Sequence, residues 1–296
     1  TDMTDDYADE PQIAAGGRIT VSGYVLDENG TVDETFTGLV YPTVYDSPNQ
    51  MRTLDNVGAG AFEYTERNKV LYSGMDSVRA GRFEFTFPVP LDINYSNEGG
   101  LLNLYALNPE TNVEGTGAFS RFTVGGTVDG LELTDSIGPS MSIYLNSPQF
   151  QSGDQTNETP YFIAELEDSI GINTVGNGVG HNLTLCIDGS ASLTYNLNNY
   201  YTPVLGDYTR GTVGFSIPEL SAGTHTLTFR AWNLMNQPTT ASLEFQVVPG
   251  LRPELLSVEA TQNPASSTTT FVLSHNRPGS VLDVQIGVYD FSGHLM

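Results

Sequence analysis

Residues 81–90 read GRFEFTFPVP, and this stretch decides the fold class expected for the chain. Its three phenylalanines, Phe83, Phe85 and Phe87, alternate with polar residues. Successive side chains of a strand point to opposite faces, so the three rings share one face and the polar residues share the other. The pattern predicts a strand that covers an aromatic core, and the two prolines at its end place that end at a sheet edge.

Short segments of the same kind recur on both sides of this stretch. In the first half they are residues 18–26, 38–46, 69–74, 101–107 and 119–126. In the second half they are residues 141–146, 161–168, 181–188, 192–197, 211–218, 225–233 and 242–248, and three more follow at 255–261, 269–275 and 281–290. The chain has 31 glycines and 16 prolines, which supply turns between the segments, and no long segment has helical periodicity.

Many short strands at this spacing predict an all-β protein with tandem immunoglobulin-like β-sandwich domains plus a truncated third β unit. The acidic, aperiodic residues 1–15 are expected to be a linker. The sandwich domains are expected at 16–127 and 128–249, and 250–296 is expected to be the truncated start of a C-terminal β module. The opening TDMTDDYADEP is unusual for a secreted precursor, so we expect the chain to be a piece of a longer protein.

The chain is strongly acidic, with 35 Asp and Glu residues against 11 Lys and Arg residues and a formal net charge of −24. Such a surface repels phosphate backbones and anionic lipid headgroups, which argues against nucleic acids and anionic membranes as partners. No apolar run reaches the length of a transmembrane helix. A net charge of this size suits a solvated extracellular protein and is compatible with calcium binding by carboxylates. A role in solubility alone also explains the charge.

The loop DENGTVDE (residues 27–34) comes nearest to a calcium site. Asp27, Asn29 and Asp33 alternate along it, as oxygen ligands do in a calcium-binding loop. The flanking helices and the glutamate at the last ligand position are missing, so a turn between two strands is the competing interpretation. No other cofactor is expected.

Cys186 is the only cysteine, so no disulfide can form within the chain and this thiol is the one candidate cysteine nucleophile. His181 has the strand parity of the neighbouring leucines, which turns it away from Cys186. A catalytic Cys–His pair needs contact between the two side chains, so we expect a structural thiol and no catalytic residue in this chain. His225 is expected on the core-facing side of its strand.

Tyr200, Tyr201 and Trp232 form the candidate ligand platform. Exposed aromatic rings at one surface can stack on sugars, whereas buried rings at these positions would belong to the rim of a sandwich. The two interpretations differ in one observable property, the exposure of the three side chains.

The most specific pattern lies in residues 168–189, 197–203 and 211–238. In order it contains D-x-x-G-I-N, G-x-G-x-G-H, a D-G turn, L-N-x-Y-Y and L-x-x-G-x-H-T-L followed by A-W. These motifs resemble the region after the catalytic domain of gingipain-family cysteine peptidases, above all the cell-surface sortases of the type IX secretion system. The first block and the later motifs H-N-R-P and V-Y-D-x-S-G resemble the same proteins, so the likeness covers nearly the whole chain.

The resemblance implies a cysteine peptidase whose Cys–His pair lies in an upstream α/β domain outside this chain. In these sortases that domain removes C-terminal sorting signals from secreted cargo. For this chain the resemblance implies a non-catalytic scaffold at the bacterial cell surface, with the upstream peptidase domain and an outer-membrane β-barrel secretion component as partners. The alternative function is a carbohydrate-binding or adhesin β-sandwich protein, which exposure of the candidate platform would favour.

Three Asp-Ser-aliphatic triplets resemble the O-glycosylation signal of proteins exported by bacteria with this secretion system. Their serines are Ser77, Ser136 and Ser169. Triplets this short also arise by chance, so unmodified serine is the competing interpretation at each position.

Overall fold

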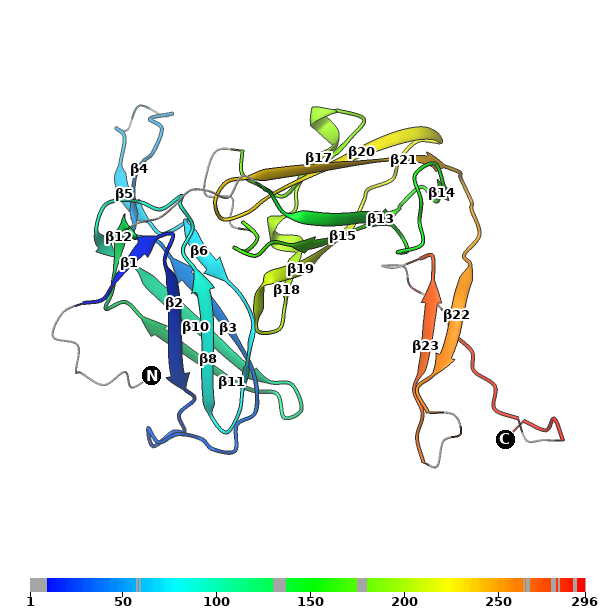
Figure 1. Ribbon diagram of the computed structural model, residues 1–296, viewed down its shortest axis with the longest axis horizontal. Helices are drawn as coiled ribbons and strands as arrows, with labels where there is room; N and C mark the ends of the chain where they lie inside the picture. Colours follow the sequence, from blue (N-terminus) through cyan, green and yellow to red (C-terminus); the bar gives the residue numbers. More distant parts are fainter. Residues whose placement is uncertain are drawn as a thin grey trace.

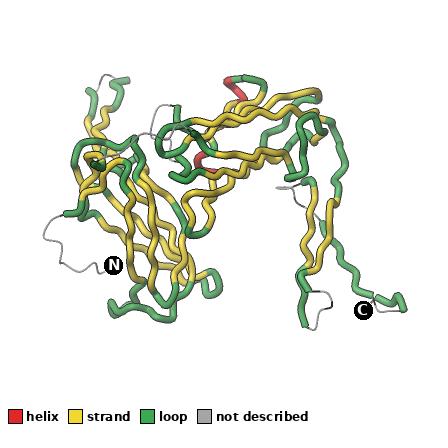
Figure 2. Tube along the Cα trace, viewed as in Figure 1, coloured by secondary structure: helices red, strands yellow, loops and turns green. Residues whose placement is uncertain are grey.

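Figures 1 and 2 show the computed structural model, in which nearly all regular structure is strand. It describes residues 10–56, 58, 60–129, 137–174, 180–262, 264, 267–277, 281, 283–289 and 292–295. Within this part of the chain the helical elements are two 3-10 turns, η1 (Ala191–Leu193) and η2 (Asn198–Tyr200). The predicted all-β fold class is confirmed, and the strands form two immunoglobulin-like sandwiches followed by a hairpin.

The first sandwich packs a five-stranded sheet against two smaller sheets. The larger sheet has the order β11-β10-β3-β6, with β7 also paired to β3. Its strands are β11 (Val113–Phe119), β10 (Leu101–Asn108), β3 (Gly38–Tyr45), β6 (Val70–Ser73) and β7 (Asp76–Val78). The smaller sheets are β2 (Arg18–Tyr24) with β8 (Arg82–Pro88), and β1 (Gln12–Ala15), β12 (Thr123–Thr127) and β9 (Glu98–Gly99). A separate hairpin of β4 (Asn49–Arg52) and β5 (Glu63–Glu66) projects from this sandwich (Figure 1).

The three phenylalanines of β8 all face the core, as their alternation predicts. The rings of Phe85 and Phe87 stack at 6.2 Å, and Tyr72 of β6 lies 4.9 Å from Phe87. Burial of each such ring stabilises the fold by about 1.5–3 kcal/mol. Gly23 of β2 pairs with Phe83, whose ring lies across the glycine where a Cβ atom would collide with it.

The second sandwich contains a four-stranded and a five-stranded sheet. The first is β13 (Ser140–Leu145), β15 (Tyr161–Glu167), β19 (Asp207–Ser216) and β18 (Tyr201–Val204), in that order. The second is β14 (Gln155–Thr156), β21 (Pro238–Val247), β20 (Gly223–Trp232), β16 (Thr184–Ile187) and β17 (Thr194–Asn196). Their facing sides meet in one core, where the rings of Phe162 and Phe229 lie 5.0 Å apart.

The last strands form a hairpin, β22 (Leu255–Ala260) with β23 (Phe271–His275). Arg277 ties it to the second sandwich, because the buried guanidinium donates to the side-chain oxygen of Asn157 at 3.1 Å and to the carbonyl of Leu251. The strand predicted at 281–290 is not found among the described residues of that range, which contain only an isolated bridge at Tyr289. Its alternating apolar side chains are exposed, and no described neighbouring strand supplies the hydrogen bonds that a strand needs.

Candidate functional site

The loop that follows β8, residues 89–97, belongs to the first sandwich and contacts the second sandwich. The backbone N–H of Leu91 donates to the carbonyl of Leu234 at 3.4 Å. The carboxylate of Asp92 reaches two further loops, since one oxygen lies 2.8 Å from Nδ1 of His181 and the other accepts from Nδ2 of Asn236 at 3.1 Å. Asp92 therefore makes polar contacts with two separate loops of the neighbouring sandwich.

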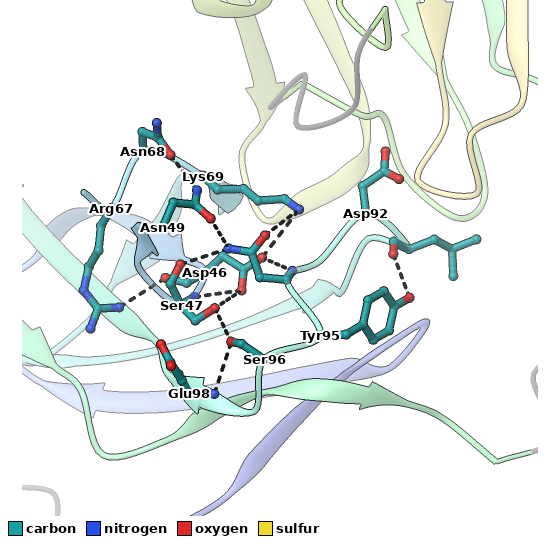
Figure 3. Close-up of polar contacts among 12 residues, drawn as sticks. Asp46, Ser47, Asn49, Arg67, Asn68, Lys69, Asp92, Tyr95, Ser96 and Glu98 are labelled. Atoms are coloured by element: carbon teal, nitrogen blue, oxygen red, sulfur yellow. Dashed lines mark hydrogen bonds and ion pairs between the residues drawn. The ribbon is translucent and has the colours of Figure 1, made fainter. Parts of the chain in front are cut away.

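A buried carboxylate at Asp46 fixes the course of this loop (Figure 3). It accepts the backbone N–H groups of Asn94 at 2.6 Å and Ser47 at 2.7 Å, and the ammonium group of Lys69 lies 3.7 Å away. Burial raises the pKa of Asp46, although these hydrogen bonds and Lys69 act in the opposite direction. Because its oxygens face backbone donors and Asp46 is fully buried, the group acts as a structural anchor.

The side chain of Asn94 completes the same network. Its Nδ2 donates to the carbonyl of Ser47 at 3.1 Å and to Oδ1 of Asn49 at 2.8 Å, while its Oδ1 accepts from Lys69 at 3.3 Å. Arg67 donates to the carbonyl of Asp46 at 3.1 Å. These contacts hold the loop from both sides, which positions Asp92 for its contacts with the second sandwich.

Trp232 lies at the junction and is only 9% exposed. The guanidinium of Arg230 lies 4.3 Å from its ring centroid, and the ring of His181 lies 4.4 Å from it. The cation and the imidazole cover a ring that strand parity places outside the core of its own sandwich.

The other two rings of the candidate platform have different surroundings. Tyr200 is 47% exposed and contacts the ring of Phe215 edge to face at 4.9 Å. Tyr201 is half-buried, and its hydroxyl group is buried. Since the ring of Trp232 is buried, the three rings do not form a common exposed surface.

The glycine of the D-x-x-G-I-N motif also belongs to the junction. Gly171 has φ +113°, and a Cβ atom there would lie 2.9 Å from the side chain of Leu234 and 3.4 Å from Pro88 of the first sandwich. Its N–H donates to the carbonyl of Asp168 at 3.1 Å, and its carbonyl accepts from the N–H of Leu234 at 3.1 Å. Only glycine combines this backbone angle with such a close approach.

Asp188 of the D-G turn and His225 of the H-T-L motif form a hydrogen-bonded pair on the second sandwich. Nδ1 of His225 lies 2.7 Å from Asp188, and Nε2 lies 2.8 Å from the carbonyl of Ser221. Burial disfavours the charged ring, but the hydrogen bonds to Asp188 and Ser221 outweigh it and raise the pKa of His225. Burial likewise acts against ionisation of Asp188, yet the N–H of Thr226 and His225 lower its pKa overall. The buried, core-side position predicted for His225 is observed.

The other predicted site residues make hydrogen bonds that stabilise local structure. Cys186 is half-buried and accepts a hydrogen bond from the hydroxyl of Thr194 at 3.3 Å, whereas His181 contacts Asp92. Asp27 closes its own turn, accepting the N–H groups of Asn29 and Thr31 at 2.9 Å each, and its pKa is lowered by the bonds from Thr31.

Asp33 closes a second turn separately, with its carboxylate accepting the N–H of Thr35 at 3.0 Å. Asp27 and Asp33 are therefore used by different local turns. Among the described residues, no group of three His, Cys, Asp or Glu side chains could hold a metal ion.

A solved structure of a known protein is similar to nearly the whole of this chain. No protein-family model matches the chain, and no curated protein is significantly similar to it. The crystal structure of dimeric latent PorU from Porphyromonas gingivalis is 39% identical over 97% of this chain and 27% of the PorU chain, with a TM-score of 0.50. The chain is similar to a region of PorU. It spans about a quarter of the length of that solved chain.

Two other solved structures that match the chain are far less similar. Fibronectin(III)-like modules of Clostridium thermocellum CbhA are 13% identical over 84% of this chain and 95% of that one, with a TM-score of 0.23. A Bacteroides ovatus protein, SGBP-B in complex with a mixed-linkage heptasaccharide, is 12% identical over 86% and 46%, with a TM-score of 0.20. TM-scores this low carry no argument about a ligand.

The serine triplets of this PorU-like chain differ in accessibility. Ser169 is exposed, whereas Ser77 is half-buried within β7, with its N–H donating to Asp76 at 2.6 Å. Ser136 lies outside the described residues. Ser169 is therefore more accessible to solvent than Ser77.

Proposed function

We propose that this chain is the non-catalytic scaffold region of a cell-surface gingipain-family cysteine peptidase, a type IX secretion sortase that processes C-terminal sorting signals. The observation that carries the proposal is the 39% identity to PorU over 97% of the chain. The peptidase chemistry belongs, in this proposal, to a domain upstream of the two sandwiches.

The junction supports a scaffold role. Asp92, the buried Asp46 network and Gly171 hold one sandwich against the other, as a spacer of defined length and angle requires. The single thiol, Cys186, contacts Thr194 instead of a histidine, which fits a structural role. No helix among the described residues is long and apolar enough to cross a membrane. We propose that the scaffold is held at the cell surface by an outer-membrane β-barrel secretion component.

Peptide hydrolysis tests the non-catalytic part of the proposal. The purified chain is incubated with a mixed-sequence fluorogenic peptide library under reducing conditions, with Cys186→Ser as the matched control. The expected result is no hydrolysis by either protein. Cleavage by the parent chain that Cys186→Ser abolishes would overturn the proposal.

A further inference from the structure

A wide groove lies between the two sandwiches. Its volume is about 810 Å³, within the range of roughly 300–1,000 Å³ that small-molecule sites occupy. Tyr41 of β3 lines it from the first sandwich, and residues around β17, η2 and β18 line it from the second. Among the described residues that line it, none is Asp, Glu, Lys, Arg or His, although the chain as a whole has a net charge of −24.

Side-chain amides dominate the wall from the second sandwich. They belong to Asn182, Asn196, Asn198 and Asn199. Asn198 is fixed in place, because its Oδ1 accepts the N–H of Leu183 at 2.8 Å and its Nδ2 donates to Oδ1 of Asn182 at 3.0 Å. The Oδ1 of Asn196 in turn accepts the N–H of Asn198 at 3.0 Å.

These hydrogen bonds leave side-chain N–H groups of the asparagines unused at the groove. An amide side chain offers two N–H donors and an oxygen acceptor, and the contacts of Asn182 and Asn196 with described residues use only their oxygens. Asn199 is exposed and its side chain makes no hydrogen bond within the described chain. The groove therefore has several amide N–H donors that a bound molecule could use.

Two tyrosines, Tyr41 and Tyr201, add aromatic surface to the groove. Tyr41 is half-buried, and its ring pairs with that of Tyr105 at 5.9 Å. The hydroxyl of Tyr201 is buried and has no hydrogen-bond partner among the described residues. Because this atom is inaccessible to solvent, it does not offer a hydrogen bond to a molecule in the groove.

The strands beside the groove argue against an extended peptide as its occupant. β6, β17 and β18 are edge strands of only three or four residues, and Pro203 interrupts the hydrogen-bonding edge of β18. Short edges with proline resist addition of a further strand. The acidic chain would also repel an anionic polymer.

We propose that this groove binds a neutral oligosaccharide, with the asparagine amides hydrogen-bonding to sugar hydroxyl groups and a tyrosine ring against a sugar face. This site goes beyond the scaffold function, and of the platform residues Tyr200, Tyr201 and Trp232 only Tyr201 lines it. Uncharged amides can both donate to and accept from hydroxyl groups, which is the complement that a neutral polyhydroxylated ligand requires.

The test is binding of the intact chain to a printed array of neutral and acidic oligosaccharides, followed by calorimetric titration of the strongest neutral ligand. Asn199→Asp keeps the side-chain shape but adds charge, and Tyr41→Ala removes the ring. Each is expected to weaken binding roughly ten-fold, as loss of one good contact does. Asn56→Asp, at an exposed site in the β4–β5 hairpin, is the matched control and should leave the affinity unchanged.

Circular dichroism and the melting temperature of each variant establish that it is folded. Binding of a neutral oligosaccharide that Asn199→Asp and Tyr41→Ala weaken supports the proposal. It is overturned if no neutral oligosaccharide binds, if only acidic ones bind, or if the two groove variants bind as tightly as Asn56→Asp. None of these outcomes depends on peptidase activity, so the scaffold proposal is tested separately.

Discussion

At the scale of single residues, the Asp188–His225 pair makes stability depend on pH. The raised pKa of His225 means that its contribution is complete below the unfolded value of about 6.5 and is lost as pH rises through the folded pKa. The lowered pKa of Asp188 means that its contribution is present above about 3.9 and is lost as pH falls through the folded pKa. The pair is therefore most stabilising between those two unfolded values.

We expect the free energy of unfolding to be higher at about pH 5.5 than at about pH 8.5, as far as this pair controls it. Urea unfolding at both values measures the difference for the parent chain and for His225→Gln. The variant should lose part of the pH dependence because glutamine does not titrate in this range. An identical pH dependence in both proteins would contradict the assigned pair.

Gly171 makes a second prediction at this scale. Gly171→Ala should lower the free energy of unfolding by about 1–3 kcal/mol, because alanine is strained at φ +113° and its Cβ would press on Leu234. Gly115→Ala is the control, since a Cβ atom there would meet only atoms at 3.9 Å. Denaturant unfolding compares the two variants, and equal losses would count against the close approach at Gly171.

At the scale of elements, alternation along a strand was a reliable guide where one face meets a core. Phe83, Phe85 and Phe87 face inward as their spacing predicts, and so does His225. The same reasoning failed at 281–290, where alternation is present but no described neighbouring strand pairs with the segment. Alternation predicts which side chains share a face of a strand, but it does not predict whether a neighbouring strand pairs with that strand.

Arg277 is a buried contact between the hairpin β22–β23 and the second sandwich. Arg277→Ala removes the buried guanidinium that contacts Asn157 and Leu251, so the hairpin should exchange its amide hydrogens faster while the second sandwich keeps its protection. Arg252→Ala, at an exposed position, is the control. Hydrogen exchange followed by mass spectrometry measures both, and unchanged exchange in the Arg277 variant would show that other contacts attach the hairpin.

At the scale of the whole molecule, the candidate site was the part that the sequence could not predict. Parity at Trp232 indicates a position outside the core of its own sandwich, yet His181, Arg230 and the junction bury the ring. Asp92 and His181 are 89 positions apart, and no local pattern pairs them. The meeting of two loops from different sandwiches is a tertiary feature, whereas motif spacing describes one strand or turn at a time.

The junction should make the two sandwiches unfold together. Asp92→Ala removes the contacts with His181 and Asn236, so the single thermal transition expected of the parent chain should broaden or divide into two. Asp283→Ala, at an exposed position, is the control. Differential scanning calorimetry distinguishes the outcomes, and an unchanged single transition in the Asp92 variant would show that other contacts couple the sandwiches.

A pull-down from outer-membrane extract, with the purified chain as bait, tests the proposed scaffold role. The Asp92→Ala variant serves as a second bait with a weakened junction. If the chain is such a scaffold, mass spectrometry should identify an outer-membrane β-barrel secretion component that is enriched on the parent chain and reduced on the variant. Recovery of glycan alone, with no β-barrel secretion component on either bait, would contradict it.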